Sequence, residues 1–260
     1  MKVAFYLGTN FDNFITQMYG LWEKKKERNM KLSIDVWTDF VCQFCYIGKR
    51  ELENAIEKAG MKEMVDINYH AYQLTPDAPT EAGNTFYEMA AAKLGMDEAR
   101  LKQMTEATQS RGASLGLEYN FDNLQDQNTL AAHRVSKYAK EMGKDKEYQE
   151  RLFKAHFTEN KFFGDGQLLV ELGQEIGLDG DKIKAIVEDE TAYLDEVKQD
   201  IETARQIGVQ GVPFFVFNEQ YAISGAQPGE TFVELLEKLK KELNLKAPLQ
   251  VFGSDDAACG

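Results

Sequence analysis

Two cysteines separated by two residues have the type and spacing that point most directly to a reaction. Cys42 and Cys45 enclose Gln43 and Phe44, after an alternating apolar segment and before an amphipathic helical pattern. A Cys-x-x-Cys pair at such a strand-to-helix turn is typical of a thiol–disulfide redox site. The helix N-terminus favours the thiolate of Cys42, because free backbone N–H groups and the helix dipole stabilise negative charge there.

We assign the two sulfurs different roles in disulfide exchange. Cys42 is the attacking thiolate and is expected to be exposed at the start of the helix. Cys45 lies one helical turn later, and we expect it to be more buried and to resolve the mixed disulfide. The alternative is a pair of core cysteines with this spacing by chance, which the turn context disfavours.

The cysteine content argues against two other uses. The chain holds three cysteines in 260 residues, and the third is Cys259 near the C-terminal end. This number is too small for a secreted disulfide scaffold. A zinc site normally needs four ligands, and no second pair of Cys or His residues has a suitable spacing. We therefore predict no metal site.

Composition limits the partners of the protein. The formal net charge is −13, and 43% of the residues are hydrophobic, which suffices for a packed core. The negative charge argues against nucleic acid or an anionic membrane as the main partner. No apolar run approaches the roughly 20 residues of a transmembrane helix, and residues 1–8 do not develop into a signal-peptide core. We therefore predict a cytoplasmic protein that binds neither nucleic acid nor membrane.

The segments around the cysteines predict a βαβ unit that positions them. Alternating apolar residues over 32–36 predict a strand, and the apolar spacing over 47–59 predicts a helix that Gly60 ends. Alternation over 65–71 predicts a second strand. The cysteines then lie at the first turn of this unit.

The remaining chain predicts a helical block, then two strands and a last helix. Residues 84–207 are mostly helical in pattern. The continuous apolar run over 212–217 predicts a buried strand, and 221–225 predicts its neighbour. Pro228 suits the first turn of the last helix.

This order of elements predicts an α/β protein, namely a thioredoxin-like fold with a large inserted α-helical domain. The core comprises residues 31–79 and 208–245, and the insertion comprises residues 80–207. Residues 246–260 form a C-terminal tail.

Residues 1–30 form an N-terminal extension for which two interpretations stay open. One is a helix that packs on the domain. The other is that Met30 is the natural start, because the codons for the preceding Lys-Lys-Lys-Glu-Arg run are largely purine, as is a bacterial ribosome-binding site.

Three segments resemble the DsbA family of thioredoxin-fold oxidoreductases. They span residues 35–48 around the cysteines, residues 128–134, and residues 208–215. The similarity is greatest to the FrnE-like branch, which is grouped with dithiol–disulfide isomerases and 2-hydroxychromene-2-carboxylate isomerases. The resemblance covers about residues 31–243.

The sequence departs from this branch at two positions. Gln43 follows the first cysteine where the branch usually has proline, and Cys259 stands alone where the tail often carries a cysteine pair. Neither Gln43 nor Phe44 supplies the positive charge of a histidine. We therefore expect Cys42 to ionise more readily than a free thiol, but less readily than in the strongest oxidants of the family.

The resemblance implies a cis peptide bond between Val212 and Pro213 that faces Cys42. In that geometry the backbone N–H and C=O of Val212 could pair with an extended substrate strand. The alternative is a trans proline at the start of an edge strand.

Further residues are candidates for substrate contact. Trp37, Phe40, Phe44 and Tyr46 are expected to form an apolar rim around the cysteines, which would suit unfolded peptide or a small aromatic ligand. Ordinary core packing explains Trp37 equally well.

Asn128 and His133 could line a groove between the insertion and the core. A buried structural histidine is at least as good an explanation for His133. Asp39 could accept a proton near Cys45, although a solvated carboxylate at the helix cap is the safer expectation.

The main functional prediction is a dithiol–disulfide oxidoreductase or isomerase that cycles Cys42 and Cys45 between dithiol and disulfide. It needs no bound cofactor, and glutathione or another dithiol is its expected redox partner. One alternative is a glutathione-dependent small-molecule isomerase or a kappa-class-like glutathione transferase. Such transferases usually have serine at the attacking position. A second alternative is a peptide-binding holdase.

Overall fold

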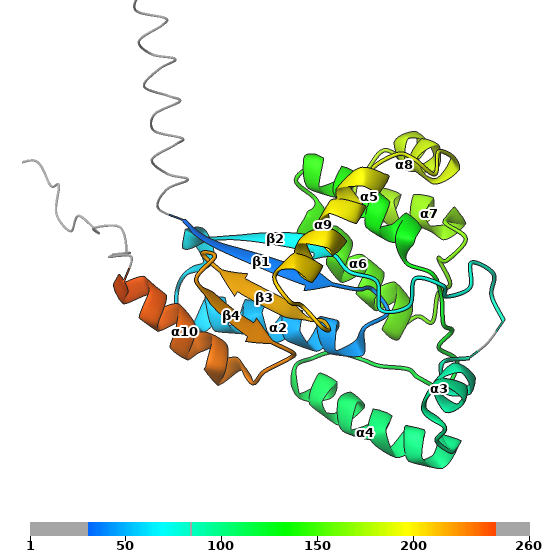
Figure 1. Cartoon of the computed structure of the whole chain (residues 1–260), viewed down its shortest axis with the longest axis horizontal. Helices are drawn as coiled ribbons and strands as arrows, with labels where there is room; N and C mark the ends of the chain where they lie inside the picture. Colours follow the sequence, from blue (N-terminus) through cyan, green and yellow to red (C-terminus); the bar gives the residue numbers. More distant parts are fainter. Residues whose placement is uncertain (1–30, 84, 243–260) are drawn as a thin grey trace, which may run out of the picture.

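A four-stranded mixed sheet with the strand order β2-β1-β3-β4 forms the centre of the protein (Figure 1). The structure is a computed structural model that describes residues 31–83 and 85–242. The strands are β1 (Leu32–Thr38), β2 (Val65–Ala71), β3 (Phe214–Phe217) and β4 (Tyr221–Ser224). β1 pairs parallel with β2 and antiparallel with β3, and β3 pairs antiparallel with β4.

The helices follow the predicted order. In chain order they are α2 (Gln43–Lys58), the 3-10 turn η1 (Lys62–Met64), α3 (Phe86–Leu94), α4 (Glu98–Ser114), α5 (Leu130–Glu141), α6 (Asp145–Phe157), α7 (Gln167–Glu175), α8 (Gly180–Glu188), α9 (Leu194–Gln206) and α10 (Gly229–Glu242). The predicted α/β fold is confirmed, because helices α3 to α9 are inserted between β2 and β3 of a thioredoxin-like core. The N-terminal extension, the start at Met30 and the tail with Cys259 lie outside the described residues.

Helices cover both faces of the sheet. α2 and α10 pack together on one face and bury an apolar core with alternate β1 side chains, including Leu32, Ile34 and Val36. Trp37 has the opposite orientation and packs with Ala204 of α9 on the other face. The period-two alternation of β1 therefore separates the two layers.

The inserted helices form two groups. α5, α6, α7 and α8 surround an apolar core that contains the fully buried Val135, Leu152 and Ile183. α3 and α4 lie apart from them, and the segment after α4 returns past the N-terminal end of α2 (Figure 1). None of the helices in the described ranges is long and apolar enough to span a membrane.

A glycine allows the proline loop to approach α2 closely. A Cβ atom at Gly48 would lie 2.9 Å from Cγ of Pro213 and 3.0 Å from Cζ of Phe215. Real Cβ atoms do not tolerate the shorter of these distances. Gly48 therefore permits the loop before β3 to rest directly on the helix that carries the cysteines.

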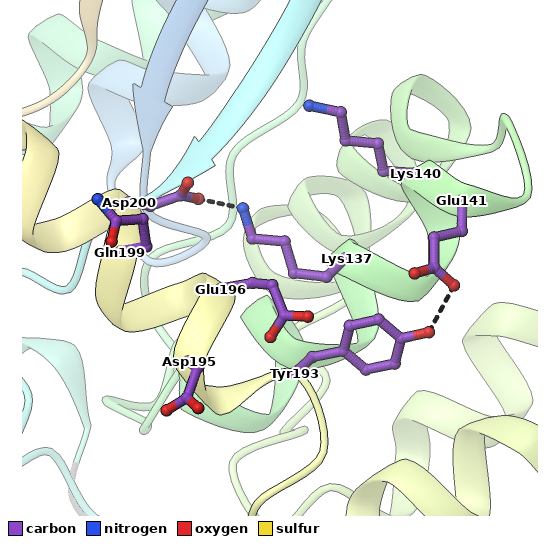
Figure 2. Close-up of a pocket in the computed structure, with 8 residues that line it drawn as sticks. All are labelled: Lys137, Lys140, Glu141, Tyr193, Asp195, Glu196, Gln199 and Asp200. Atoms are coloured by element: carbon purple, nitrogen blue, oxygen red, sulfur yellow. Dashed lines mark hydrogen bonds and ion pairs between the residues drawn. The ribbon is translucent and has the colours of Figure 1, made fainter.

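A cluster of charged side chains joins the insertion to the sheet. Asp200 of α9 accepts hydrogen bonds from His70 Nδ1 at 3.0 Å, from the backbone N–H of Ala71 at 2.6 Å, and from Lys137 of α5. Figure 2 shows the Lys137 and Asp200 side chains meeting across the space between α5 and α9. His70 Nε2 lies 2.9 Å from Asp35 Oδ1 on β1. The cluster thus connects α5 and α9 to two neighbouring strands.

The charges in this cluster change the pKa values of its members. Burial lowers the pKa of His70, but the hydrogen bonds and negative charges of Asp200 and Asp35 outweigh burial and raise this pKa above its ordinary value. Burial raises the pKa of Asp200, but the His70 hydrogen bond and the charges of Lys137 and His70 hold this pKa below its ordinary value. The charged forms of both residues therefore stabilise the folded state.

Gly48→Ala is expected to lower the free energy of unfolding by about 1–3 kcal/mol, because the new methyl group overlaps the Pro213 ring. Helix propensity alone predicts the opposite sign, a gain of about 1 kcal/mol. Urea unfolding of wild type and Gly48→Ala measures the difference in their free energies of unfolding. Asn54→Ala, at an exposed position of the same helix, is the matched control and should be neutral or stabilising.

His70→Gln is expected to destabilise the protein most in mildly acidic solution. Because the folded-state pKa of His70 is raised, protonated His70 contributes fully to the free energy of unfolding below about pH 6.5. This contribution is lost as pH rises through the folded-state pKa. Asp200 contributes above about pH 3.9 and loses its contribution as pH falls through its lowered pKa.

Urea unfolding of wild type and His70→Gln at about pH 5.5 and about pH 9 tests this window, and the stability difference should be smaller at the higher pH. Asp66→Asn is the control, because the half-exposed Lys31–Asp66 pair should contribute less than about 1 kcal/mol at either pH. A pH-independent difference for His70→Gln would contradict the expectation.

Candidate active site

Cys42 is the N-cap residue of α2, where the sequence predicts the attacking sulfur. Its backbone is extended, with φ −85° and ψ 106°, and its N–H donates to the Asp39 carbonyl at 3.0 Å. The Cys42 carbonyl accepts from the Cys45 N–H at 2.9 Å. The first turn of α2 contains no acidic residue. The Cys42 side chain makes no capping hydrogen bond, but the helix N-terminus favours negative charge at this position, and no carboxylate in that turn opposes this effect.

The loop before β3 supplies the second side of the site. The Val212–Pro213 peptide bond is cis, as the resemblance implies. The Cys42 thiol donates to the Val212 carbonyl, with 3.4 Å between sulfur and oxygen. Pro213 itself is buried against α2. Cys42, Cys45 and Pro213 are thus brought together by the fold.

Both cysteines are free thiols, and both are buried. Cys42 is 5% exposed and Cys45 is 2% exposed. The expectation of an exposed Cys42 is therefore wrong, because Val212 on one side and the inserted helical part on the other cover the helix start. Burial and the neighbouring Cys42 raise the pKa of Cys45 well above its ordinary value, which favours its protonated form.

The four aromatic side chains predicted as a rim occupy different environments. Phe44 is 45% exposed and lies next to the cysteines in sequence, so it is available to a substrate. Tyr46 is buried, donates to Glu150 Oε1 at 2.8 Å and stacks on Phe153. Its packing cluster contains both cysteines.

Trp37 and Phe40 are not placed at an accessible rim. Trp37 is buried, stacks on His70 with 4.7 Å between ring centroids, and donates from Nε1 to the Asp200 carbonyl at 3.0 Å. Phe40 is fully buried in the core of the helical insertion, next to His133. The predicted rim position is therefore wrong for these two side chains and for Tyr46, which is 4% exposed; of the four predicted aromatic residues, only Phe44 is exposed.

Asn128 and His133 have structural environments. The Asn128 amide donates to the carbonyls of Pro76 and Ala78 at 2.8 and 3.2 Å, and its Oδ1 accepts from the Leu130 N–H. His133 is almost completely buried in α5. The structure thus does not place either side chain in an open groove, and the structural interpretation of His133 fits its burial.

Asp39 is buried rather than solvated. Its Oδ2 accepts from the Leu74 N–H at 2.7 Å, whereas its Oδ1 has no hydrogen-bond partner and lies 3.4 Å from His133 Nε2, which is also without one. The expectation of a solvated cap carboxylate is therefore wrong, because α5 covers this side of the turn. Proton acceptance from Cys45 stays a prediction.

Tyr119 contacts the start of α2, which the sequence does not reveal. Its hydroxyl donates to the Gln43 carbonyl at 2.8 Å, and its ring belongs to the cluster that contains Cys42 and Cys45. No local motif indicates this role, because Tyr119 lies in an irregular segment that only the tertiary fold brings to α2.

Other parts of the described structure carry no comparable chemistry. A hollow of about 650 Å³ lies between α5 and α9 (Figure 2). Its lining combines Lys137 and Lys140 with several carboxylates and contains no cysteine. Over residues 31–83 and 85–242, no three His, Cys, Asp or Glu side chains converge as metal ligands would.

Comparison with known proteins agrees with this geometry. A family model described as DSBA-like thioredoxin domain matches residues 33–237. The chain is 28% identical over 215 residues to the uncharacterized protein YwbO of Bacillus subtilis (strain 168), a similarity that covers 82% of this chain and 100% of YwbO.

Solved structures with this fold include enzymes of several kinds. The probable DsbA oxidoreductase SCO1869 from Streptomyces coelicolor is 30% identical, with a TM-score of 0.76 and coverage of 88% of this chain and 96% of that chain. The cytosolic disulfide reductase DsbM from Pseudomonas aeruginosa, solved with GSH, is 15% identical, with a TM-score of 0.56 and coverage of 80% and 99%. A 2-hydroxychromene-2-carboxylate isomerase is 16% identical, with a TM-score of 0.60 and coverage of 83% and 100%.

The residues that the family model matches include the cysteine pair at the start of α2 and the cis-proline loop that faces this pair. This chain belongs to the DSBA-like thioredoxin domain family.

Proposed function

We propose that the protein is a dithiol–disulfide oxidoreductase in which Cys42 is the nucleophile and Cys45 the resolving thiol. The observation that carries the proposal is the position of Cys42 at the N-cap of α2, with its sulfur 3.4 Å from the Val212 carbonyl. A thiol at a helix N-terminus is favoured as a thiolate and is therefore suited to attack a disulfide.

The reaction proceeds by two thiolate attacks. The Cys42 thiolate attacks one sulfur of a substrate disulfide, the sulfur–sulfur bond breaks, and one thiolate leaves and takes up a proton. Cys45 then loses its proton and attacks Cys42 Sγ in the mixed disulfide, which releases the second thiolate. The substrate gains two electrons and two protons, and Cys42 and Cys45 form a disulfide.

An external dithiol closes the cycle. Two molecules of glutathione, or one protein dithiol, reduce the Cys42–Cys45 disulfide by the same exchange in reverse. The similarity in fold to DsbM, a cytosolic reductase solved with GSH, supports glutathione and a cytoplasmic setting as the working hypothesis. We propose that no metal or organic cofactor takes part, because the two sulfurs carry both electrons.

A glutathione-dependent isomerase or transferase is the main rival, since a 2-hydroxychromene-2-carboxylate isomerase shares the fold. Such chemistry needs only one group that binds or activates the glutathione thiol. The resolving thiol Cys45, buried one turn after Cys42, has no use in that reaction. The intact pair therefore favours disulfide exchange.

Cys42→Ser is expected to lower the turnover of a small disulfide such as hydroxyethyl disulfide by at least about a hundredfold, because a hydroxyl is a much poorer nucleophile than a thiolate at neutral pH. Cys45→Ser should still attack but should stop at the mixed disulfide. A glutathione-coupled assay measures turnover, and mass spectrometry of the protein after exposure to glutathione disulfide detects the adduct.

Asn54→Ala, at an exposed position of α2, is a control for general damage to this helix, because it leaves both sulfurs and their neighbours in place. Disulfide turnover that survives in Cys42→Ser would refute the assignment. Survival of glutathione transfer to an electrophile in that variant, with no disulfide turnover in wild type, would favour the rival.

A further inference from the structure

Cys42 lies between two neighbours that leave little of its surface free. On one side is the Val212 carbonyl, 3.4 Å from the sulfur. On the other side, Tyr119 donates to the carbonyl of Gln43, the next residue in the chain, at 2.8 Å. Burial raises the pKa of Tyr119, and the nearby sulfurs of Cys42 and Cys45 add to this effect. The phenol thus bonds to the backbone one residue after Cys42, and its ring belongs to the apolar cluster that contains both sulfurs.

Tyr119 is fixed by contacts on both sides of its backbone. The Tyr119 carbonyl accepts from Gln109 Nε2 at 3.1 Å, and the next residue, Asn120, donates its N–H to the Phe157 carbonyl at 2.7 Å. The Tyr119 ring stacks on Phe121 with 5.5 Å between centroids and 7° between planes. Tyr119 is 7% exposed. The position of the Tyr119 ring is thus fixed by packing and by hydrogen bonds of the adjoining backbone.

A glycine in α4, Gly112, allows the Tyr119 ring to pack closely against this helix. A Cβ atom at Gly112 would lie 2.5 Å from a Tyr119 ring carbon, which is far inside van der Waals contact. Glycine in a helix interior costs about 1 kcal/mol relative to alanine. The close approach of the Tyr119 ring is a packing reason for glycine at this position.

A buried nucleophile favours substrates that have few atoms around the disulfide bond. Disulfide exchange requires the attacking sulfur to reach the substrate sulfur directly. A small disulfide can approach Cys42 beside Val212 and Phe44. A disulfide within a protein is flanked by polypeptide on both sides and needs more space. Cys42 is only 5% exposed, and the Tyr119 ring belongs to the same buried apolar cluster.

We propose that Tyr119 is a specificity-determining residue that restricts Cys42 to small disulfides of about the size of glutathione disulfide and excludes disulfides carried by protein chains. This inference rests on the disulfide exchange proposed above. The exchange is the same for both substrates: Cys42 and Cys45 give up two electrons, and the substrate disulfide becomes two thiols.

Stopped-flow exchange with two probes tests the inference. The reduced protein is mixed with glutathione disulfide or with oxidised, unfolded ribonuclease A, and the second-order rate constants are compared. Tyr119→Ala should raise the rate with the protein disulfide by about tenfold or more and leave the glutathione disulfide rate within about threefold, as expected when a steric block is removed. Tyr119→Phe keeps the ring and should behave like wild type with both probes.

Tyr87→Ala is the matched control. Tyr87 is equally buried in the same apolar cluster, but its hydroxyl bonds to Thr105. This variant should leave the ratio of the two rate constants unchanged. Gly112→Ala is a second route, because its methyl group displaces the Tyr119 ring, and it should also change the ratio.

Each outcome separates the inference from the proposed function. Equal rates of wild type with both probes, or an unchanged ratio in Tyr119→Ala and Gly112→Ala, would overturn the role of Tyr119 but leave disulfide exchange standing. A wild type that alkylates at Cys42 with iodoacetamide but exchanges with neither probe would overturn the proposed function and the inference with it.

Discussion

The contact between the proline loop and α2 is the constraint on which the site depends. Because Gly48 has no side chain, the Pro213 ring rests against the helix, and Val212 is held where its carbonyl meets the Cys42 sulfur. β3 follows directly, so the same contact ties the central sheet to the helix that carries both thiols. Any change that separates loop and helix therefore alters the reacting geometry as well as the core.

The helical insertion holds α2 from the opposite direction. Glu150 of α6 accepts hydrogen bonds from Tyr46, Lys49 and Arg50, which all lie on α2. Arg111 of α4 adds an ion pair with Glu51 at 2.9 Å. These contacts are partly solvent-exposed, and their individual contributions are small. Together they orient the helix between two separate parts of the chain, which is how an insertion far away in sequence shapes the cysteine environment.

The sequence predicted the features that depend on local pattern. The strands, the helix start at Cys42 and the proline loop follow from periodicity, turn position and short motifs. The sequence did not predict how deeply Cys42, Asp39 and Phe40 are buried, because the residues that cover them come from α5, α6, the segment around Tyr119 and the loop that contains Val212. Burial at these positions is a property of tertiary packing between segments far apart in the sequence, and no local pattern encodes it.

The stacking of Trp37 on His70 gives the protein an optical property. The two rings lie 4.7 Å apart and nearly parallel, and the indole also packs with Val212. A protonated imidazole in contact with an excited indole accepts an electron from it and quenches its fluorescence. We therefore expect the emission of Trp37 to dim when His70 takes up a proton, so that Trp37 reports the charge of the cluster that joins the helical insertion to the sheet.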